Sequence, residues 1–423
     1  MAGRRAGRVP DVQVYNPAMT ISSDICVIGA GAVGKAAALA IAQAGLSVAL
    51  VTPESAPAVL KPSIDWDLRV YALNAVARSL LSSLRVWDAM DVSRIAPVDS
   101  MAVHGDGSAA GSVNFDAYGA RVDALAWIVE DSNLNRALDA ALGFAAGVRR
   151  VNGNAVQLDC STERAVVTLD SGQAIDCSLV IGADGAHSWV RMQADIGMDY
   201  RAYGQRAVVA NFETTHPHHG VASQWFLSGE GVVALLPLPG RRVSLVWSAP
   251  EPLADKLLRE SPLQLCERLA QLPGQSLGAF AMLAPAAPKA FPLRLIRSHS
   301  LVAHRVALVG DAAHVVHPLA GQGMNLGFAD IDALMAALAR REQKSDCGDA
   351  RTLSRYARSR KEEVLLMQVA TDGLQRLFST QLGPVKALRN LGMTAVDKVP
   401  FLKRRLMSQA FGRSLHSSAH PFS

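Results

Sequence analysis

The stretch from Val306 to Gly327, VALVGDAAHVVHPLAGQGMNLG, limits the possible folds more than any other part of the chain. It begins with four apolar residues that have the length and β-branched content of a buried parallel strand. Gly310 and Asp311 end that strand, a loop follows, and apolar residues then recur at helical spacing after Gly321. This order predicts a strand that delivers a carboxylate to its C-terminal edge, with a glycine-rich helix start beside it.

A helix start of this kind can hold an anionic or flat ligand. The first backbone amides of a helix lack partners within the helix and favour negative charge, and glycines allow a flat ligand close to the backbone. The Asp311 carboxylate can accept hydrogen bonds from hydroxyl groups. His314 and His317, in the intervening loop, are predicted to structure it rather than to transfer protons. We predict a cofactor site formed by Gly310, Asp311, Met324 and Asn325.

A second cofactor signal lies near the N-terminus, where a strand predicted from Ile21 to Ile28 leads into the glycine pattern GAGAVG. An alanine-rich helix and a second strand, Ser47 to Val51, follow, as a dinucleotide-binding βαβ unit requires. The first glycine makes the tight turn, the second lets the backbone approach a pyrophosphate, and the third lets helix and strand pack closely. The predicted cofactor-binding residues here are Gly29, Gly31, Ala32, Val33 and Gly34.

One position departs from the dinucleotide-binding pattern. An acidic residue is expected at the end of the second strand, where it binds the ribose hydroxyls of the adenosine half. This chain has Thr52 there, with Glu54 two residues later. A threonine hydroxyl makes one hydrogen bond where a carboxylate makes two. Thr52 is therefore a predicted ribose contact that holds the cofactor less tightly, unless Glu54 reaches back.

A third buried strand, Leu179 to Ile181, ends in Gly182-Ala183-Asp184-Gly185. Together the motifs GxGxxG, GADG and GDAAH, the last followed by HPLAGQGMNLG, resemble the flavin-binding motifs of the single-component FAD-dependent aromatic hydroxylases, the group A flavoprotein monooxygenases. The segments DLRVYALN, ALLPL and SLVWSAP make the resemblance closest to the ubiquinone-biosynthesis hydroxylases. The likeness extends from Ile21 to about Gly412.

The resemblance implies FAD as the bound cofactor and NAD(P)H as a diffusible reductant. In hydroxylases of this type, oxygen adds to the reduced flavin at C4a, and the hydroperoxide transfers one oxygen to an electron-rich phenol ring. The resemblance also implies that Arg69 and Asp184 contact the cofactor. Four residues are predicted to serve catalysis, by shielding the flavin from water and stabilising negative charge on it: Pro318, Gly321, Gln322 and Gly323.

From Tyr200 to about Arg297 the pattern changes to alternating strands joined by hairpin turns, which predicts an antiparallel sheet. The resemblance implies that this sheet covers the flavin and lines the substrate pocket with its inner face. Each candidate lining residue is, taken alone, equally consistent with ordinary sheet core. The candidates are Gln224, Phe226, Leu236, Pro237 and Trp247.

The predicted fold class is α/β: a doubly wound, Rossmann-like FAD-binding domain, an antiparallel-sheet substrate domain and a helical C-terminus. The FAD-binding domain is predicted to be discontinuous, with a helix from Ala124 to Leu142 in its middle segment. Its predicted segments are residues 19–98, 121–198 and 298–378, the substrate-domain sheet comprises 99–120 and 199–297, the leader is 1–18 and a basic tail covers 379–423.

Composition narrows the function classes. Half of the 423 residues are apolar, so the chain can bury a large core. The net charge is only +5, without a Lys/Arg stripe interleaved with aromatics, which argues against a nucleic-acid partner. Five scattered cysteines show no metal-ligand spacing, which predicts reduced thiols, a cytoplasmic location and no metal site.

Basic residues are concentrated at the two ends of the chain. The leader, 1–18, is predicted to be disordered, or untranslated if synthesis starts at Met19. The tail, 379–423, carries seven Lys/Arg against one acid, Asp397. Two interpretations of the tail stay open: a solvated helical face on the main domain, or a peripheral element on the inner surface of a membrane.

The predicted function is hydroxylation of an aromatic ring of a polyprenyl phenol or a related quinone precursor in ubiquinone biosynthesis, with O2 as co-substrate. Two alternatives stay open. A monooxygenase of a small soluble phenolic would carry the same cofactor motifs. A non-catalytic accessory flavoprotein of a quinone-pathway complex would keep the fold without turnover, and Thr52 at the acidic position gives this alternative slight support.

Overall fold

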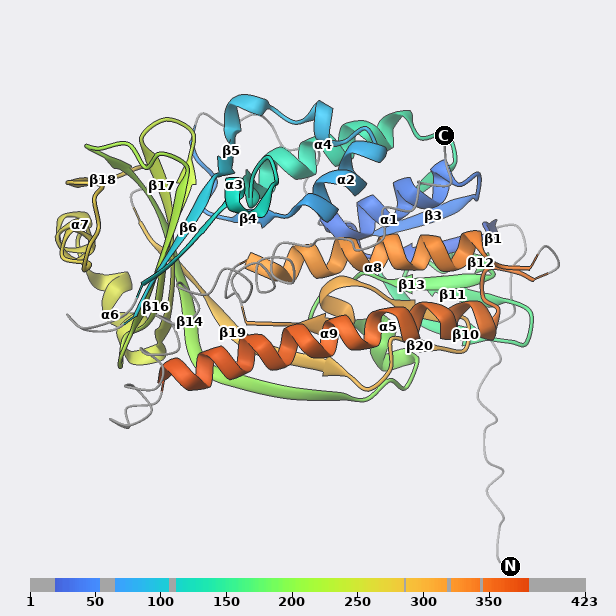
Figure 1. The fold of residues 1–423 in the computed structure, drawn as a ribbon. Helices are drawn as coiled ribbons and strands as arrows, with labels where there is room; N and C mark the ends of the chain where they lie inside the picture. Colours follow the sequence, from blue (N-terminus) through green and yellow to red (C-terminus); the bar gives the residue numbers. More distant parts are fainter. Residues whose placement is uncertain are drawn as a thin grey trace, which may run out of the picture.

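The computed structural model describes residues 20–53, 65–105, 112–284, 287–317, 321–342 and 345–379. A parallel sheet covered by helices and a large, mostly antiparallel sheet lie at opposite ends of the molecule (Figure 1). The predicted α/β class is therefore confirmed. The leader lies outside the described residues, and so does the predicted tail apart from Ser379, which ends the last helix.

The parallel sheet has six strands in the order β20-β21-β13-β2-β3-β9, and every neighbouring pair except β20 and β21 is parallel. Its central strands are fully buried, as their continuous apolar sequences require. Their C-terminal ends carry the three glycine motifs at one edge. The strands are β20 (Val302–Ala303), β21 (Val306–Leu308), β13 (Leu179–Gly182), β2 (Ile25–Ile28), β3 (Val48–Thr52) and β9 (Val148–Asn152).

Helices cover one face of the parallel sheet, and a smaller four-stranded sheet covers the other. On one face, strand residues such as Val27 and Ile181 pack against α1 (Ala32–Gln43), α8 (Gln322–Ala339) and α4 (Asp131–Phe144). On the other face, Cys26 and Val180 pack against a four-stranded sheet. Its strands, in spatial order, are β1 (Thr20–Ser22), β12 (Ala174–Cys177), β11 (Ala165–Leu169) and β10 (Ala155–Cys160).

The single strand predicted from Ile21 to Ile28 is wrong, because the chain forms two strands there in different sheets. β1 pairs with β12, and β2 enters the parallel sheet. The break falls at Ser23 and Asp24, where the Asp24 carboxylate accepts hydrogen bonds from the backbone N–H and the hydroxyl of Ser47 at 2.8 and 2.7 Å. These bonds tie the junction of the two strands to the start of β3.

The helix predicted from Ala124 to Leu142 is wrong in its first part. Residues Ala126–Glu130 form strand β8, and α4 begins only at Asp131. β8 pairs antiparallel with β4 (Val70–Leu73) and β5 (Ile95–Val98). A short apolar run fits a strand or a buried helix equally well, and here the two neighbouring strands decide the outcome.

The large sheet has the strand order β22-β19-β14-β17-β16-β15-β6-β7, with β18 attached to β14. It therefore joins strands from the two segments predicted for the substrate domain. The division into domains itself stays a prediction. The strands are β6 (Ser100–His104), β7 (Ser112–Asp116), β14 (Met198–Thr214), β15 (Val221–Leu227), β16 (Gly231–Leu238), β17 (Arg242–Pro250), β18 (Phe280–Met282), β19 (Lys289–Ser298) and β22 (His314–Val315).

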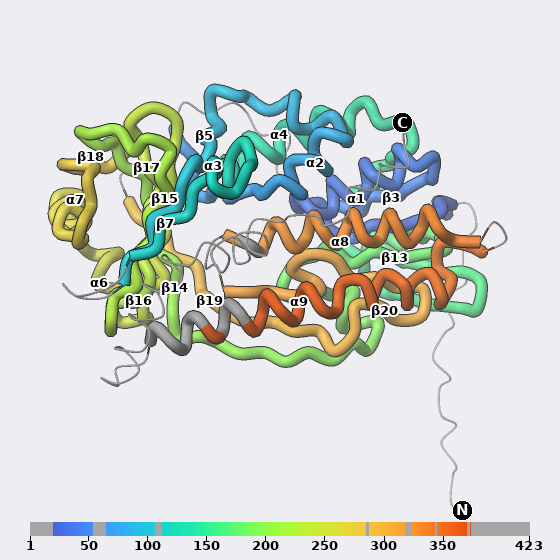
Figure 2. The backbone as a smooth tube through the Cα atoms, in the orientation of Figure 1, coloured from blue at the N-terminus to red at the C-terminus, as the bar shows by residue number. Residues whose placement is uncertain are grey.

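Two long strands connect the two ends of the molecule. β14 and β19 leave the large sheet as a ribbon that runs beneath α9 (Ala350–Ser379) toward the parallel sheet (Figure 2). One face of the large sheet is covered by α6 (Glu251–Arg259) and α7 (Pro262–Ala270), which pack on a core that includes Trp225 and Trp247. Its other face turns toward the glycine motifs.

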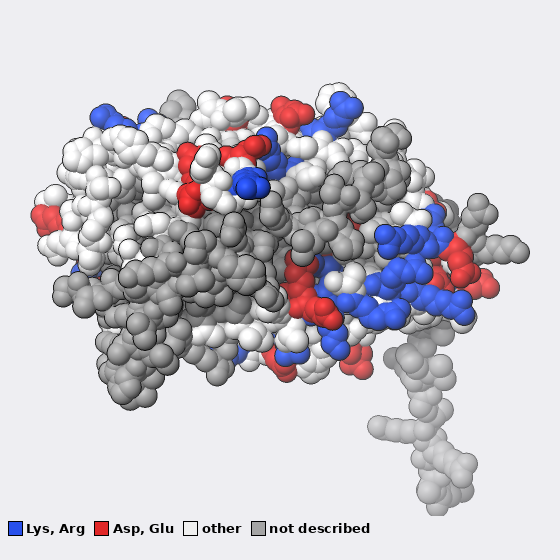
Figure 3. Space-filling model, viewed as in Figure 1, with Lys and Arg blue, Asp and Glu red and all other residues white. Residues whose placement is uncertain are grey.

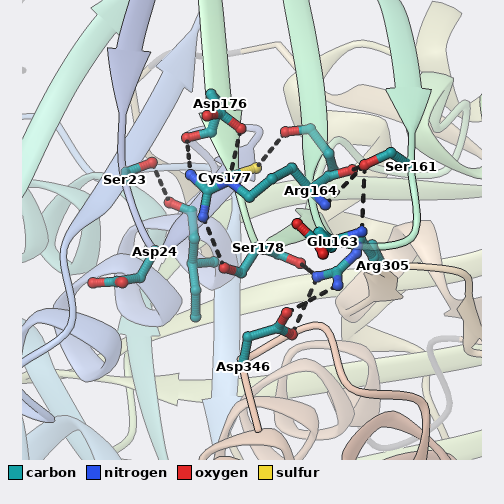
Figure 4. A network of polar contacts seen from close by, with 12 residues as sticks. Ser23, Asp24, Ser161, Glu163, Arg164, Asp176, Cys177, Ser178, Arg305 and Asp346 are labelled. Atoms are coloured by element: carbon teal, nitrogen blue, oxygen red, sulfur yellow. Dashed lines mark hydrogen bonds and ion pairs between the residues drawn. The ribbon is translucent and has the colours of Figure 1, made fainter. Parts of the chain in front are cut away.

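A polar network fastens the edge of the parallel sheet opposite the glycine motifs (Figure 4). The buried Arg305 donates to the carbonyls of Ser178 and Thr162 and to both carboxylate oxygens of Asp346, the last at 3.1 and 2.9 Å. Beside it, Arg164 binds Asp176 at 2.8 Å. These bonds hold the β10–β11 hairpin and the segment before α9 to the starts of the parallel strands. Across the described ranges, no helix has the length and hydrophobicity to span a bilayer.

Candidate active site

A cleft of about 690 Å³ opens where the C-terminal ends of three parallel strands meet the large sheet. Parallel strands place the residues that follow them at one edge, which explains why motifs far apart in sequence meet here. The motif residues that line it are Gly31, Ala32, Val33, Ala183, Gly185, Val309 and Asp311, together with Gly321, Gly323 and Met324 from the start of α8.

The three glycines of the first motif have different surroundings. Gly29 has a φ of +111°, and a Cβ there would lie 2.3 Å from the Ala183 carbonyl oxygen. A Cβ on Gly34 would lie 1.9 Å from the Gly29 carbonyl oxygen. Around Gly31, in contrast, no atom of the described chain lies within 4 Å of the Cβ position. Gly29 and Gly34 thus serve packing, and Gly31 leaves the backbone open to a ligand at the start of α1.

Arg69 presents a cation to the cleft. No ion-pair partner for its guanidinium occurs among the described residues, and the group lies 5.5 Å from the ring centre of Tyr71. Burial lowers the pKa of Arg69, but Tyr71, Asp131 and Asp311 outweigh this effect and raise it. Tyr71 in turn donates to Asp131 at 2.6 Å. A permanently charged guanidinium that faces the cleft is suited to a phosphate.

Asp311 points into the cleft from the third motif. Burial raises the pKa of its carboxyl group, although the charges of His314, Arg69 and Arg294 oppose the rise. Gly310, just before it, adopts a φ of +60°, and a Cβ there would lie 3.2 Å from a methyl carbon of Val33. The third motif therefore packs directly against the first and holds the Asp311 carboxylate at the cleft.

Asp184 has one oxygen in use and one without a partner. Its Oδ2 accepts a hydrogen bond from the backbone N–H of Val190 at 3.0 Å, whereas Oδ1 is buried and has no partner in the described part of the chain. Buried polar atoms are nearly always satisfied in folded proteins. Asp184 itself is not part of the described cleft lining, and its role as a cofactor ligand stays a prediction.

Arg191 is a residue of this site that the sequence did not reveal. Its buried guanidinium donates to the Ala186 carbonyl at 2.9 Å and to the Ala312 carbonyl at 2.8 Å. It thereby ties the second motif to the third. The only sequence signal was its place three residues after Ser188, which caps the short helix α5 (Trp189–Gln193), and many surface arginines share such a position.

Two predicted cofactor ligands have side chains that bond to the protein instead. The Thr52 hydroxyl donates to Asn152 on β9 at 2.9 Å. The Asn325 amide accepts from the Asn74 N–H at 3.0 Å and donates to the Ala72 carbonyl at 2.9 Å, which joins α8 to β4. Neither residue lines the cleft. Their roles as ligands stay predictions.

The start of α8 lies at the cleft, as the glycine pattern predicted. Gly321 caps the helix with a φ of +66° and no side-chain cap, and a Cβ there would lie 3.1 Å from the Cβ of Ala72. Pro318 and Glu54 lie outside the described residues, and the side chain of Gln322 is not described. Their predicted roles, and the catalytic roles of Gly321 and Gly323, stay predictions.

The predicted substrate residues do not line the cleft. Trp247 and Pro237 lie on the opposite face of the sheet, where Trp247 is fully buried beneath α6 and α7 and donates to the Glu230 carbonyl at 2.9 Å. The prediction of Trp247 is wrong by one position along β17: its neighbour Val246 lines the cleft. The remaining three candidates share the face of Val246 but lie outside the cleft lining: Gln224, Phe226 and Leu236.

The large sheet presents an apolar surface to the cleft, formed by residues of β14, β17 and β19. We call this surface the apolar wall, and it consists of Ala207, Val209, Val246, Phe291, Pro292 and Leu293. Phe291 remains 46% exposed. At the rim, Arg294 is the one charged residue that the sheet contributes to the described cleft lining, and its guanidinium lies 2.7 Å from Nε2 of His187.

Comparison with known proteins decides which cofactor this cleft takes. The family model described as "FAD binding domain" matches residues 22–367, most of the chain. The chain belongs to the FAD-dependent aromatic hydroxylases. The predicted family and the predicted cofactor are confirmed, and this flavoprotein monooxygenase is an enzyme of the class that its motifs resemble.

Two similar proteins are named as ubiquinone hydroxylases. The ubiquinone hydroxylase UbiL of Rhodospirillum rubrum is 35% identical over 92% of this chain and 90% of its own length. The 3-demethoxyubiquinol 3-hydroxylase of Escherichia coli is 34% identical over 92% of this chain and 98% of its own length. Among solved structures, p-nitrophenol 4-monooxygenase from Pseudomonas putida has a TM-score of 0.73 at 18% identity, covering 93% of this chain and 99% of its own, so the two share a fold.

The residues present fit FAD. The open backbone at Gly31 and the cation of Arg69 suit a pyrophosphate, and the free oxygen of Asp184 and the carboxylate of Asp311 suit hydroxyl groups. In the described residues, no group of three or more His, Cys, Asp or Glu side chains could hold a metal ion.

Proposed function

We propose that this monooxygenase hydroxylates an aromatic ring of a polyprenyl phenol or a related quinone precursor in ubiquinone biosynthesis, with NAD(P)H as reductant and O2 as co-substrate. The apolar wall carries the proposal. It offers an isoprenoid chain six apolar side chains on one side of the cleft. The printed names of the similar proteins from Rhodospirillum rubrum and Escherichia coli support the same substrate class.

A small soluble phenolic is the weaker candidate. Such molecules often carry a carboxylate, and a pocket selects them with cations and hydrogen-bond donors that face the ring. The apolar wall has none, and Arg294 stands at its rim against His187. The wall thus favours a substrate whose bulk is hydrocarbon.

Some residues of the site would bind the cofactor, and others would exclude water from it. FAD, when bound, supplies the reduction of oxygen and the transfer of one oxygen atom to the ring. Arg69 and the amides after Gly31 would hold its phosphates, and Asp311 and Asp184 would accept hydrogen bonds from its hydroxyls. The amides at the start of α8 would stabilise negative charge. The apolar wall would keep water from the reacting atoms.

We expect the enzyme to act from the cytoplasmic side, at the inner surface of a membrane, because its substrate is a lipid. The seven basic residues of the tail support this expectation. A basic patch over the first turns of α9 supports it as well (Figure 3). Its exposed arginines are Arg340, Arg351, Arg355 and Arg358. A contact with another protein of the quinone pathway is the alternative for the same surface.

The first experiment is the absorption spectrum of the purified protein, followed by NADPH and NADH oxidation with a short-chain prenylated phenol, with 4-hydroxybenzoate and with neither. Hydrogen peroxide is measured in each. We expect a flavin spectrum, oxidation stimulated only by the prenylated phenol, and little peroxide. Stimulation by 4-hydroxybenzoate alone would favour the small-phenol alternative, and bound flavin without stimulated oxidation would favour an accessory flavoprotein.

A further inference from the structure

A buried carboxylate lies directly behind the third glycine motif. Asp330, on α8, is fully buried and does not line the cleft. Its Oδ2 accepts hydrogen bonds from the backbone N–H of Gly310 at 2.9 Å and from Nε2 of His314 at 2.8 Å. Its Oδ1 accepts from Nε of Arg360, on α9, at 2.7 Å. Both oxygens are therefore occupied by protein donors.

Asp330 is held in its ionised form. Burial alone would raise the pKa of this carboxyl group, but the charges of His314 and Arg360 and their hydrogen bonds outweigh burial and lower it. Arg360 also donates to the Leu326 carbonyl at 3.3 Å and pairs with Glu363. Burying such charges costs solvation energy that an apolar cluster would not lose, so stability alone gives little reason for this arrangement.

The network fixes the turn that aims Asp311. The N–H that Asp330 binds belongs to Gly310, the residue before Asp311, at a position with positive φ packed against Val33. Asp330 therefore restrains the peptide that sets the direction of the Asp311 side chain. Arg360 restrains Asp330 in turn, and it reaches the network from α9, whose described side chains do not contribute to the cleft lining.

We propose that Asp330 and Arg360 are positioning residues of the cofactor site: they set the place of Asp311 against FAD without touching the cofactor. α9 then belongs to the site through Arg360, although it lies outside the cleft. The proposal rests on the FAD site and not on the identity of the aromatic substrate, so it stands or falls independently of the proposed function.

A double-mutant cycle tests the proposal, because a residue that acts through Asp311 has no effect once Asp311 is disabled. The FAD dissociation constant is measured by dilution of the purified holoenzymes of the wild type, Asp311→Asn, Asp330→Asn and the double variant. We expect each single variant to weaken FAD binding about tenfold, since Asp311→Asn weakens the charged hydrogen bond to FAD directly and Asp330→Asn weakens the same bond by displacing Asp311. The double variant should bind as weakly as Asp311→Asn alone. Multiplying effects, or an unchanged dissociation constant in Asp330→Asn, would overturn the proposal.

Two further variants separate positioning from general stability. Asp346→Asn removes the ion pair to Arg305 at the opposite edge of the sheet. It should lower the melting temperature and leave FAD affinity unchanged. If Asp330→Asn does not fold, Arg360→Lys replaces it in the cycle, because lysine keeps the charge but cannot bind Asp330 and the Leu326 carbonyl together. Unaltered FAD affinity and unaltered circular dichroism of the bound flavin in Arg360→Lys would contradict the proposal.

Discussion

Asp311 is exposed to the open cleft, but the protein around its carboxyl group excludes enough water to raise the pKa of that group, although Arg69 and Arg294 oppose the rise. An ionised carboxylate accepts hydrogen bonds from cofactor hydroxyls better than a neutral one. We therefore expect FAD affinity to fall as the pH drops through this raised pKa, above the ordinary value of about 3.9. The measurement is the FAD dissociation constant between pH 4 and pH 8.

The same group predicts an opposite trend for the apoprotein. A folded-state pKa above the unfolded value means that the native state binds more protons in that range, so the contribution of Asp311 to stability grows as the pH falls. Asp311 should therefore increase the free energy of unfolding of the apoprotein over the same pH range in which the holoenzyme loses FAD. Asp311→Asn should remove both trends, and a variant with the wild-type pH profile of FAD affinity would refute this role.

Phe291 is the exposed aromatic residue of the apolar wall. If the wall binds the isoprenoid chain, Phe291→Ala should raise KM for a prenylated phenol by about three- to tenfold, with kcat nearly unchanged, because the lost contact is made equally in ground and transition states. KM for the same phenol without its prenyl chain should not change. Phe144→Ala is the matched control, because Phe144 is 92% exposed and lies outside this cleft. Equal KM ratios for both substrates would exclude the wall as the chain site.

At the scale of elements, the junction of β2 and α1 separates two uses of glycine. A methyl group on Gly34 would lie 1.9 Å from the Gly29 carbonyl oxygen, so Gly34→Ala must displace α1 from the sheet. A methyl group on Gly31 meets no described atom, but it would lie where the pyrophosphate is predicted to approach the backbone. We expect Gly34→Ala to lose thermal stability and FAD together, and Gly31→Ala to keep the fold of the apoprotein and lose FAD. Circular dichroism and flavin content distinguish them, and full FAD occupancy in Gly31→Ala would contradict the assignment.

At the scale of the whole molecule, the fold buries all but one of its five free cysteines. Cys160 is exposed, whereas Cys26, Cys177, Cys266 and Cys347 are buried. Burial raises the pKa of Cys347 to about 11, and the hydrogen bond that the Cys26 thiol makes to Cys177, together with burial, raises the pKa of Cys26. Thiolates, not thiols, react with disulfide reagents. One thiol should react quickly with Ellman's reagent in the native protein and the remaining four only after denaturation. In Cys160→Ser the fast phase should disappear; a second fast thiol would show an opening that the fold does not predict.

The sequence by itself determined the features that depend on neighbouring residues. The three strand-end motifs combine an apolar strand with glycines and an acid within a few residues, and parallel strands bring such ends to one edge whatever the rest of the chain does. The placement of Asp311 and the α8 start at one cleft followed from this rule, whereas the family and the cofactor followed from the resemblance of the motifs to those of the FAD-dependent aromatic hydroxylases. Gly29 and Gly34 have the close contacts that the glycine pattern requires.

Only the tertiary structure decided which side chains face the cleft and which bond elsewhere. Strand faces alternate with a period of two, so an error of one residue moved the choice from Val246 to Trp247. The Thr52 hydroxyl binds Asn152, one hundred residues away, and Asp330 accepts hydrogen bonds from the Gly310 turn, from His314 on β22 and from Arg360 on α9. Such partners are brought together by packing between distant elements, and no local pattern encodes that packing.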